Sequence, residues 1–252
     1  METRRGRVVN LILFERREAG DAATIRVDDG RARHIREVLK AAPGQVIQIG
    51  LIDGPRGLGT VVGVEGTAVT LHCDFESSTP PLPAVDLLLA LPRPKVLKRL
   101  WAQLAALGVG RIMLVNAVRV ERQYFDTHVL EASCYRPLLI EGLQQARDTR
   151  LPVVSIHRQL KVLVEDELDP IAGRAARLLA DPDAPDSVGA ALNPPKPERC
   201  LLAVGPEGGW SEFERNLLAA HGFRGVSMRD RSLRSDTACI ALLALVHEAV
   251  DQ

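Results

Sequence analysis

The sequence lacks a net charge, is poor in aromatic residues and contains no long apolar run. Its 252 residues include 32 basic and 32 acidic side chains, and aromatic residues make up 4% of the chain. Because Lys and Arg are not in excess, binding to nucleic acid would depend on where the basic residues lie. The longest apolar run, Ala238 to Val246, has nine residues, whereas a transmembrane helix needs about 20. We therefore expect a soluble, cytoplasmic protein without a membrane partner.

Cysteine is also scarce, with four residues at Cys73, Cys134, Cys200 and Cys239. None forms a CxxC pair, and none has a His at the spacing of a metal site. The sequence therefore predicts four reduced thiols, no disulfide framework and no bound metal ion.

A proline-rich break divides the chain. Residues 76–83 read Glu-Ser-Ser-Thr-Pro-Pro-Leu-Pro, a composition that does not suit the interior of a regular element. We interpret this segment as a linker between two domains, which span residues 1–76 and 84–252.

The region before the break is predicted to be mostly β-structure. One helix is expected in it, capped by Asp28 or Asp29, with Ile35, Val38 and Leu39 on its apolar face. The pattern predicts a small β-barrel with one helix. Its expected strands are β-rich segments bounded by Gly and Asp: Val8–Phe14, Thr24–Val27, Gln45–Ile52, Thr60–Val64 and Ala68–Cys73.

After the break, strands and helices alternate. Val85–Leu91 is apolar at every position except Asp86, which is typical of a strand buried on both faces of a parallel sheet. The alternation predicts an α/β domain with helices on both faces of the sheet. Residues 181–197, rich in Pro, Asp and Ala, are expected to be a surface excursion. The other predicted elements are strands at Arg111–Asn116, Pro152–His157, Cys200–Val204 and Gly225–Met228, and helices at Val96–Leu107 and Leu130–Arg147.

A glycine-rich loop follows one of these strands and reads Gly205-Pro206-Glu207-Gly208-Gly209. Ser211 and Glu214 have the spacing of a capping box, so a helix should begin directly after the loop. Glycines at the carboxyl end of a buried strand let backbone groups approach a ligand closely. A tight structural turn is the alternative interpretation. The spacing is not that of a dinucleotide-binding fingerprint, which argues against a nicotinamide-dependent oxidoreductase.

A second loop, residues 227–234, follows the next predicted strand and contains three arginines. It also opens a helix, for which Ser235 or Asp236 is the expected N-cap. If the two strands are neighbours, their loops form one ligand-binding cleft. A solvated turn is the alternative.

The two loops together resemble those of the SPOUT family of S-adenosylmethionine-dependent RNA methyltransferases. Within that family, the chain is similar to the 16S ribosomal RNA (uracil-N3) methyltransferase branch. The glycine loop carries most of this resemblance. It is supported by His34-Ile35-Arg36-Glu37-Val38-Leu39-Lys40 with Pro43-Gly44-Gln45, by Leu91-Pro92-Arg93-Pro94-Lys95, and by Gln145–Pro152 in family order.

The resemblance implies a PUA-like β-barrel followed by an α/β domain whose chain end forms a trefoil knot. It also implies a homodimer that acts on ribosomal RNA or the small ribosomal subunit. S-adenosylmethionine would be held by the knot loops. Carried onto this sequence, the cofactor-binding residues are Gly205, Pro206, Glu207, Gly208, Gly209, Met228, Arg229, Ser232 and Leu233.

For the chemistry, we expect Arg234 to stabilise charge that develops on a carbonyl oxygen of the base. Glu207 is the second catalytic candidate, and either Glu207 or Asp236 could orient Arg234 or accept a proton. The chain departs from the family pattern where Met228-Arg229 replace Leu-Gly and Ser232 replaces Ile. A diverged, catalytically weak dimer that binds RNA therefore remains the alternative function.

Basic residues are unevenly distributed, which bears on an RNA partner. The segment from Leu91 to Arg122 contains seven basic residues and one acidic residue, whereas residues 161–190 contain three basic and seven acidic ones. A second cluster lies on the helix before the break, where a solvated helix face and a structural role for His34 are the alternatives. The predicted RNA-binding residues are Arg33, His34, Arg36, Lys40, Arg93 and Lys95.

Overall fold

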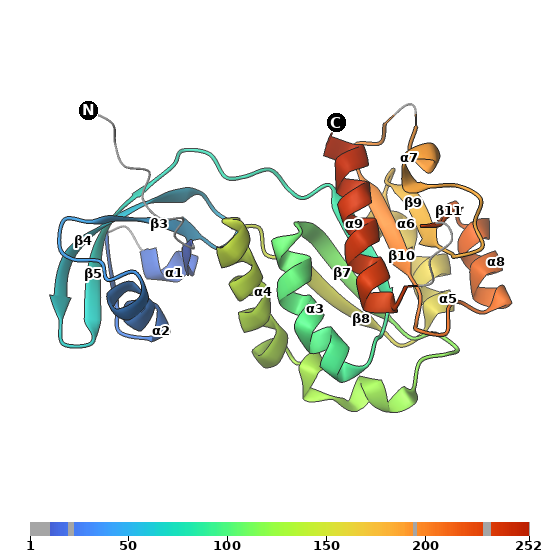
Figure 1. Ribbon diagram of the computed structural model, residues 1–252, viewed down its shortest axis with the longest axis horizontal. Coiled ribbons are helices and arrows are strands. Elements are labelled where there is room, and N and C mark those ends of the chain that lie inside the picture. The colour runs from blue at the N-terminus through green and yellow to red at the C-terminus, as the bar shows by residue number, and fades with distance from the viewer. Residues whose placement is uncertain (1–10, 20–22, 194–195, 229–232, 252) are drawn as a thin grey trace. The chain divides into compact units, whose positions relative to one another are not determined.

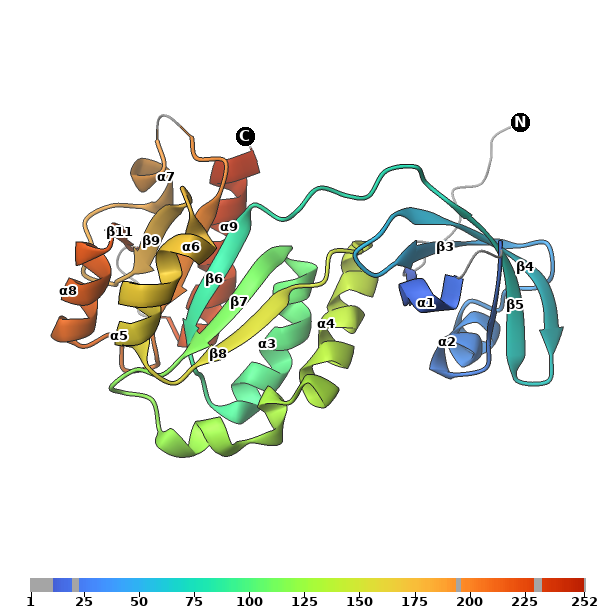
Figure 2. The same cartoon turned by 180° about the vertical axis from the view of Figure 1, so that it is seen from behind.

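The computed structural model describes residues 11–19, 23–193, 196–228 and 233–251 (Figures 1 and 2). Contacts within the chain define two compact units. The first comprises Met1–Pro81 and Ile140–Leu151, and the second comprises Leu82–Leu139 and Pro152–Gln252. Among the described residues, no helix combines the length and the apolar content needed to cross a bilayer.

The first unit is built on a five-stranded sheet in the order β1-β3-β4-β5-β2. β1 pairs with β3 in parallel, and the other pairs are antiparallel. Alternate residues of these strands enter one core with Ile35, as expected for a sheet with one buried face. The strands are β1 (Ile12–Phe14), β2 (Thr24–Val27), β3 (Val46–Leu51), β4 (Arg56–Glu65) and β5 (Ala68–Phe75).

The helix of the first unit differs from the prediction in its apolar face. Asp29 caps α2 (Gly30–Arg33), as one of the two predicted caps, and a short α1 (Arg16–Ala19) precedes it. The next turn, His34–Val38, is π-helical, because the Leu39 amide donates to the His34 carbonyl five residues back. This wider turn rotates Val38 outward, where it is 63% exposed, so its predicted place in the core is wrong.

Residues 140–151 pack within the first unit although they lie far from it in sequence. The Leu11 amide donates to the Gln144 carbonyl, and the Asp53 amide donates to the Thr149 carbonyl. The Thr149 hydroxyl donates to the Gly54 carbonyl at 2.6 Å. A Cβ atom at position 50 would lie 2.7 Å from the Thr149 methyl carbon, which explains why Gly50 occupies this place in β3.

The second unit contains a six-stranded, fully parallel sheet in the order β11-β9-β10-β6-β7-β8. The two central strands β6 and β10 are buried at every residue, Asp86 included, as their largely apolar sequences predicted. The α/β fold of this unit is thereby confirmed. The strands are β6 (Val85–Ala90), β7 (Val109–Val115), β8 (Val153–His157), β9 (Ala176–Ala180), β10 (Cys200–Val204) and β11 (Phe223–Val226).

Helices cover both faces of this sheet. α3 and α9 contact β6, β7 and β10 on one face, and α5 and α6 lie on the opposite face (Figures 1 and 2). Shorter 3-10 segments span Arg122–Asp126 and His128–Leu130, and a π-helical turn spans Leu163–Glu167. The helices that follow β6 along the chain are α3 (Pro94–Ala106), α4 (Ala132–Ala146), α5 (Leu160–Val162), α6 (Leu168–Ala172), α7 (Val188–Ala191), α8 (Glu212–Ala220) and α9 (Ser235–Asp251), and residues 140–146 of α4 belong to the first unit.

Strand β9 corrects two sequence-based expectations. It was not predicted, because it is short and contains Arg177, whose guanidinium binds the His221 carbonyl and the Asp169 carboxylate. It lies between β10 and β11, so the two strands that carry the predicted loops are not neighbours. Consequently, the residues that follow β9 also belong to the edge at which those loops meet.

Candidate functional site

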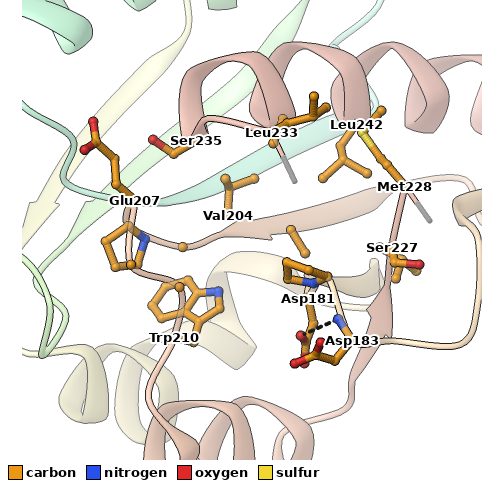
Figure 3. Close-up of a pocket in the computed structure, with 18 of the residues that line it drawn as sticks. Asp181, Asp183, Val204, Glu207, Trp210, Ser227, Met228, Leu233, Ser235 and Leu242 are labelled. Atoms are coloured by element: carbon orange, nitrogen blue, oxygen red, sulfur yellow. Dashed lines mark hydrogen bonds between the residues drawn. The ribbon is translucent and has the colours of Figure 1, made fainter. Parts of the chain in front are cut away.

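A cavity of about 350 Å³ lies at the carboxyl ends of β9, β10 and β11 (Figure 3). Each strand contributes the residues that directly follow it: Asp181 after β9, Gly205 after β10 and Ser227 after β11. Helix α9 closes the remaining side with Ala238 and Leu242. Parallel sheets bind ligands at this edge because the loops after neighbouring strands converge there.

The glycine loop lies against Trp210. A Cβ atom at Gly205 would be 3.0 Å from Nε1 of Trp210, so a larger residue would push the indole out of place. Gly209 has a φ of +73°, a conformation that L side chains rarely adopt. The Trp210 side chain is 3% exposed, and its Nε1 has no hydrogen-bond partner among the described residues. A buried donor beside a cavity suits a polar ligand, because leaving it unpaired is costly.

The side chains of Glu214 and Arg119 hold the glycine loop in place. Ser211 and Glu214 form the predicted capping box at the start of α8. The buried Glu214 carboxylate also accepts a hydrogen bond from the Val118 amide at 2.7 Å, which ties the loop after β7 to the glycine loop. Arg119, from the loop after β7, donates to the Gly208 carbonyl through its guanidinium.

Sequence reasoning missed Arg119 as a site residue. In the sequence, Arg119 is only one of the seven basic residues between Leu91 and Arg122, because it lies 89 positions from its partner Gly208. No local motif marks such a contact. Only the parallel pairing of β6 with both β7 and β10 brings the two loops to the same edge.

The second predicted loop lines the cavity in part. Met228 and Leu233 are lining residues, as expected. Arg229 and Ser232, also predicted to bind the cofactor, lie outside the described residues. Helix α9 begins at Ser235, so Ser235 and Asp236 belong to its first turn, and the prediction that one of them is the N-cap is wrong by one residue.

Arg234 lies directly before α9, with its side chain 71% exposed. Its Nε is 3.8 Å from Oδ1 of Asp236, and Nη2 of Arg99 is 3.1 Å from Oδ2 of the same carboxylate. The structure therefore pairs Arg234 with Asp236, which was one of two predicted partners. Burial raises the pKa of the nearby Cys239 thiol to about 12, so this thiol stays protonated at neutral pH.

Glu207 pairs with Arg93 instead. Nη2 of Arg93 is 3.4 Å from Oε2 of Glu207, and Figure 3 shows that this carboxylate points away from Asp181 and Met228. A predicted RNA-binding residue and a predicted catalytic residue thus meet at one rim of the cavity. Nearby, the Tyr124 hydroxyl donates to the Glu121 carboxylate at 2.6 Å, and this hydrogen bond raises the pKa of Tyr124.

Carboxylates also line the opposite wall. Oδ1 of Asp181 accepts a hydrogen bond from the Asp183 amide, and Oδ2 lies 3.9 Å from Nε of Arg215. Both aspartates belong to the segment that was predicted to be a surface excursion; Asp183 is exposed and Asp181 is half-buried, and both line the cavity because they follow β9. Among the described residues, no group of three or more His, Cys, Asp or Glu is arranged to hold a metal ion.

The remaining predicted RNA-binding residues are divided between the two units. Arg33 and Lys40 are exposed and His34 and Arg36 are half-buried on the helix of the first unit. Because His34–Val38 is a π-helical turn, these side chains do not follow the 3.6-residue repeat of a regular α-helix. Lys95 is exposed in the first turn of α3 in the second unit, close in sequence to Arg93.

Comparisons with known proteins agree with this fold. Residues 79–247 match a family model described as an RNA methyltransferase domain. A ribosomal RNA small subunit methyltransferase E from Treponema pallidum is 32% identical over 244 residues, covering 94% of this chain and 90% of the relative. One from Borreliella burgdorferi is 25% identical over 235 residues, covering 92% and 93%.

Two solved structures have the same fold. A ribosomal RNA small subunit methyltransferase E from Neisseria gonorrhoeae, bound to S-adenosyl methionine, superposes with a TM-score of 0.75 at 19% identity, covering 96% of this chain and 98% of that one. A methyltransferase from Legionella pneumophila with bound S-adenosyl methionine superposes with a TM-score of 0.73 at 20% identity, covering 96% of this chain and 98% of that one. With the site and these matches together, the chain belongs to the RNA methyltransferase domain family.

Proposed function

We propose that this protein is an S-adenosylmethionine-dependent methyltransferase that modifies a base of ribosomal RNA. The observation that carries this proposal is the cavity at the ends of β9, β10 and β11, formed by the Gly205–Gly209 loop in a chain of this family. Curated relatives that match over more than nine-tenths of this chain are named ribosomal RNA small subunit methyltransferases. The modified atom in this proposal is N3 of a uridine in 16S RNA, as the resemblance implies.

The residues of the cavity fit S-adenosylmethionine. Its volume of about 350 Å³ falls in the range of small-molecule sites, about 300–1,000 Å³. Backbone groups of Gly205 to Gly209 and the unpaired Nε1 of Trp210 provide polar contacts, while Leu233 and Leu242 provide an apolar wall. Asp181 and Asp183 supply negative charge for a cationic ligand. Met228, Arg229 and Ser232 complete the proposed binding residues.

The chain's own residues hold and orient the reactants. When bound, S-adenosylmethionine supplies an electrophilic methyl group. The glycine loop, braced by Arg119 and Glu214, keeps the cofactor site in one geometry, which favours an in-line transfer. Arg234 stabilises negative charge on a carbonyl oxygen of the base, and Asp236 orients the guanidinium. Glu207 lies at the rim with Arg93, where it can accept a proton from the base.

The proposal includes an architecture. In it, residues 1–76 form a PUA-like RNA-binding barrel, and residues 84–252 form a SPOUT domain with a trefoil knot. The active form is a homodimer that acts in the cytoplasm on ribosomal RNA or the small ribosomal subunit. Arg33, His34, Arg36, Lys40, Arg93 and Lys95 contact the RNA. The five-stranded sheet of the first unit and the parallel sheet of the second support this division.

The alternative, a diverged dimer that binds RNA with little catalysis, rests on Met228. This residue lines the cavity where the family has Leu, and the replacement Arg229 follows it. Cofactor binding separates the two functions, because the alternative predicts weak or no binding of S-adenosylmethionine.

The test combines calorimetry with base mapping. The purified protein should bind S-adenosylmethionine and should add one methyl group to a uridine of unmodified small ribosomal subunits, located by mass spectrometry of RNA fragments. A nicotinamide cofactor should give no heat in the same experiment. Absence of heat with S-adenosylmethionine at millimolar concentration, or an unchanged base map with an active cofactor site, would contradict the proposal.

A further inference from the structure

A second cavity in the second unit, of about 340 Å³, lies at the carboxyl ends of β7 and β8. Asn116 directly follows β7, and Arg158 directly follows β8. The first turn of α8 supplies Phe213. None of the residues proposed above to bind the cofactor or perform the chemistry lines this cavity.

The two cavities share a wall. Val118 and Val120 line the second cavity, while Arg119 between them lines the cofactor cavity. Glu214 strengthens this wall, because its carboxylate binds the Val118 amide on one side and Ser211 on the other. Consecutive residues of one backbone segment therefore line both cavities, which makes the cavities neighbours.

The lining of the second cavity is positive. Three cations, Arg122, Arg158 and Lys161, surround it, and Glu214 is the acidic side chain among its lining residues. Glu214 is buried and both of its oxygens already accept hydrogen bonds, so it is not free to bind a ligand, and the three cations outnumber this single carboxylate. Lys161 and Arg158 have exposed carboxylate partners at 3.8 and 3.5 Å. Such surface pairs are weak and give way to a phosphate group.

An apolar platform accompanies these charges. Phe213 is 62% exposed and Val118 is 72% exposed, although both lie next to well-packed structure. Oδ1 of Asn116, also a lining residue, is buried and has no hydrogen-bond partner among the described residues. An aromatic ring, phosphate-binding cations and a buried acceptor together match a nucleotide, whose base stacks and donates an N–H while its phosphate is neutralised.

We propose that this second cavity binds a nucleotide of the substrate RNA that flanks the methylated base. Its base stacks on Phe213 and donates to Asn116, and its phosphates lie against Arg122, Arg158 and Lys161. This inference rests on the proposed function and names how the RNA is held during the reaction. It makes Phe213 a residue that determines affinity for RNA without touching the cofactor.

The test uses Phe213→Leu and Phe213→Trp in the full chain, with small ribosomal subunits as the RNA substrate. Leu keeps the apolar surface but removes the ring, so we expect the KM for subunits to rise about 10-fold. Trp keeps the ring and should leave KM within about 2-fold of the wild type. Neither variant should change kcat, the affinity for S-adenosylmethionine or the thermal unfolding midpoint, because Phe213 is exposed and outside the cofactor cavity.

A matched charge pair tests the cations. Lys161→Glu should raise KM for subunits about 10-fold, whereas Arg174→Glu makes the same charge change at an exposed position before β9 and should have little effect. Equal KM values for wild type, Phe213→Leu and Lys161→Glu would overturn the inference while the methyltransferase activity stands. A wild type that binds the cofactor but methylates no ribosomal RNA would overturn the proposed function and this inference with it.

Discussion

The two halves of the carboxyl edge of the parallel sheet are built differently. Beyond β9, β10 and β11, the cavity is lined by loop backbone, the apolar side of α9 and charged groups of both signs, which include two aspartates, Glu207, Arg119 and Arg215. Beyond β7 and β8, the cavity is lined by three cations and an exposed aromatic ring. Strand β6 lies between the halves, and Arg93, which follows it, reaches Glu207 on the cofactor side.

This difference separates recognition by shape from recognition by charge. A glycine loop that packs on Trp210 leaves little freedom, so it selects a ligand by fit. Exposed arginine and lysine side chains on a loop attract a polyanion and tolerate different sequences. One edge of a sheet can therefore bind a small cofactor and a large RNA side by side. Variants that affect one of the two cavities, or the Glu214 side chain that connects their loops, test this division.

Glu214→Ala should have the largest effect, because Glu214 joins the two halves. Removing the carboxylate leaves the Val118 and Ser211 amides without their acceptor, which should lower the free energy of unfolding by about 3 kcal/mol. Affinity for both cofactor and RNA should fall. Glu212→Ala, in the same helical turn but exposed, should cost less than about 1 kcal/mol. Urea unfolding measures the free energy of unfolding of both variants. Similar losses of this free energy in the two variants would show that Glu214 does not connect the two loops.

Arg234→Ala should impair the chemistry without impairing cofactor binding. If the guanidinium stabilises charge in the transition state, turnover should drop about 100-fold while the Kd for S-adenosylmethionine stays within about 3-fold. Single-turnover methylation and calorimetry measure these quantities. Arg174→Ala is the matched control, since Arg174 is exposed at the opposite edge of the sheet. Unchanged turnover in Arg234→Ala would remove this residue from the mechanism.

Gly205→Ala should weaken the binding of S-adenosylmethionine but not of RNA, by a smaller factor than the turnover loss expected for Arg234→Ala. The new Cβ would lie 3.0 to 3.2 Å from three atoms of the Trp210 ring, and the resulting shift should reduce affinity for S-adenosylmethionine about 10-fold. The control is Gly189→Ala, because a Cβ atom there meets nothing within 4 Å. Calorimetry and subunit binding measure the two affinities. A parallel loss of RNA affinity would argue against two separate halves.

Sequence patterns were sufficient wherever the signal is local. The largely apolar sequence of β6 predicted a buried strand, and Ser211 with Glu214 predicted the start of α8. Asp29 was one of two predicted caps and is the observed one. Each of these signals depends on neighbours within four or five residues, which is why the printed sequence carries it.

Local patterns failed where the outcome depends on distant residues. Strand β9 is only five residues long and includes Arg177, and its place in the sheet comes from pairing with β10 and β11 on either side. The π-helical turn at His34–Val38 exposes Val38 although the spacing favours an α-helical face. Asp181 and Asp183 lie in the predicted surface segment, but only their position after β9 places them at the cavity.

By itself, the sequence determined the class of fold, the position of the glycine loop and the family to which the chain belongs. Those features follow from residue order and from motifs contained in single segments. Only the tertiary structure decided that Arg119 braces Gly208, that Glu207 pairs with Arg93 and that a basic cavity adjoins the proposed cofactor site. The physical reason is that parallel strands distant in sequence end at a common edge, where their loops meet.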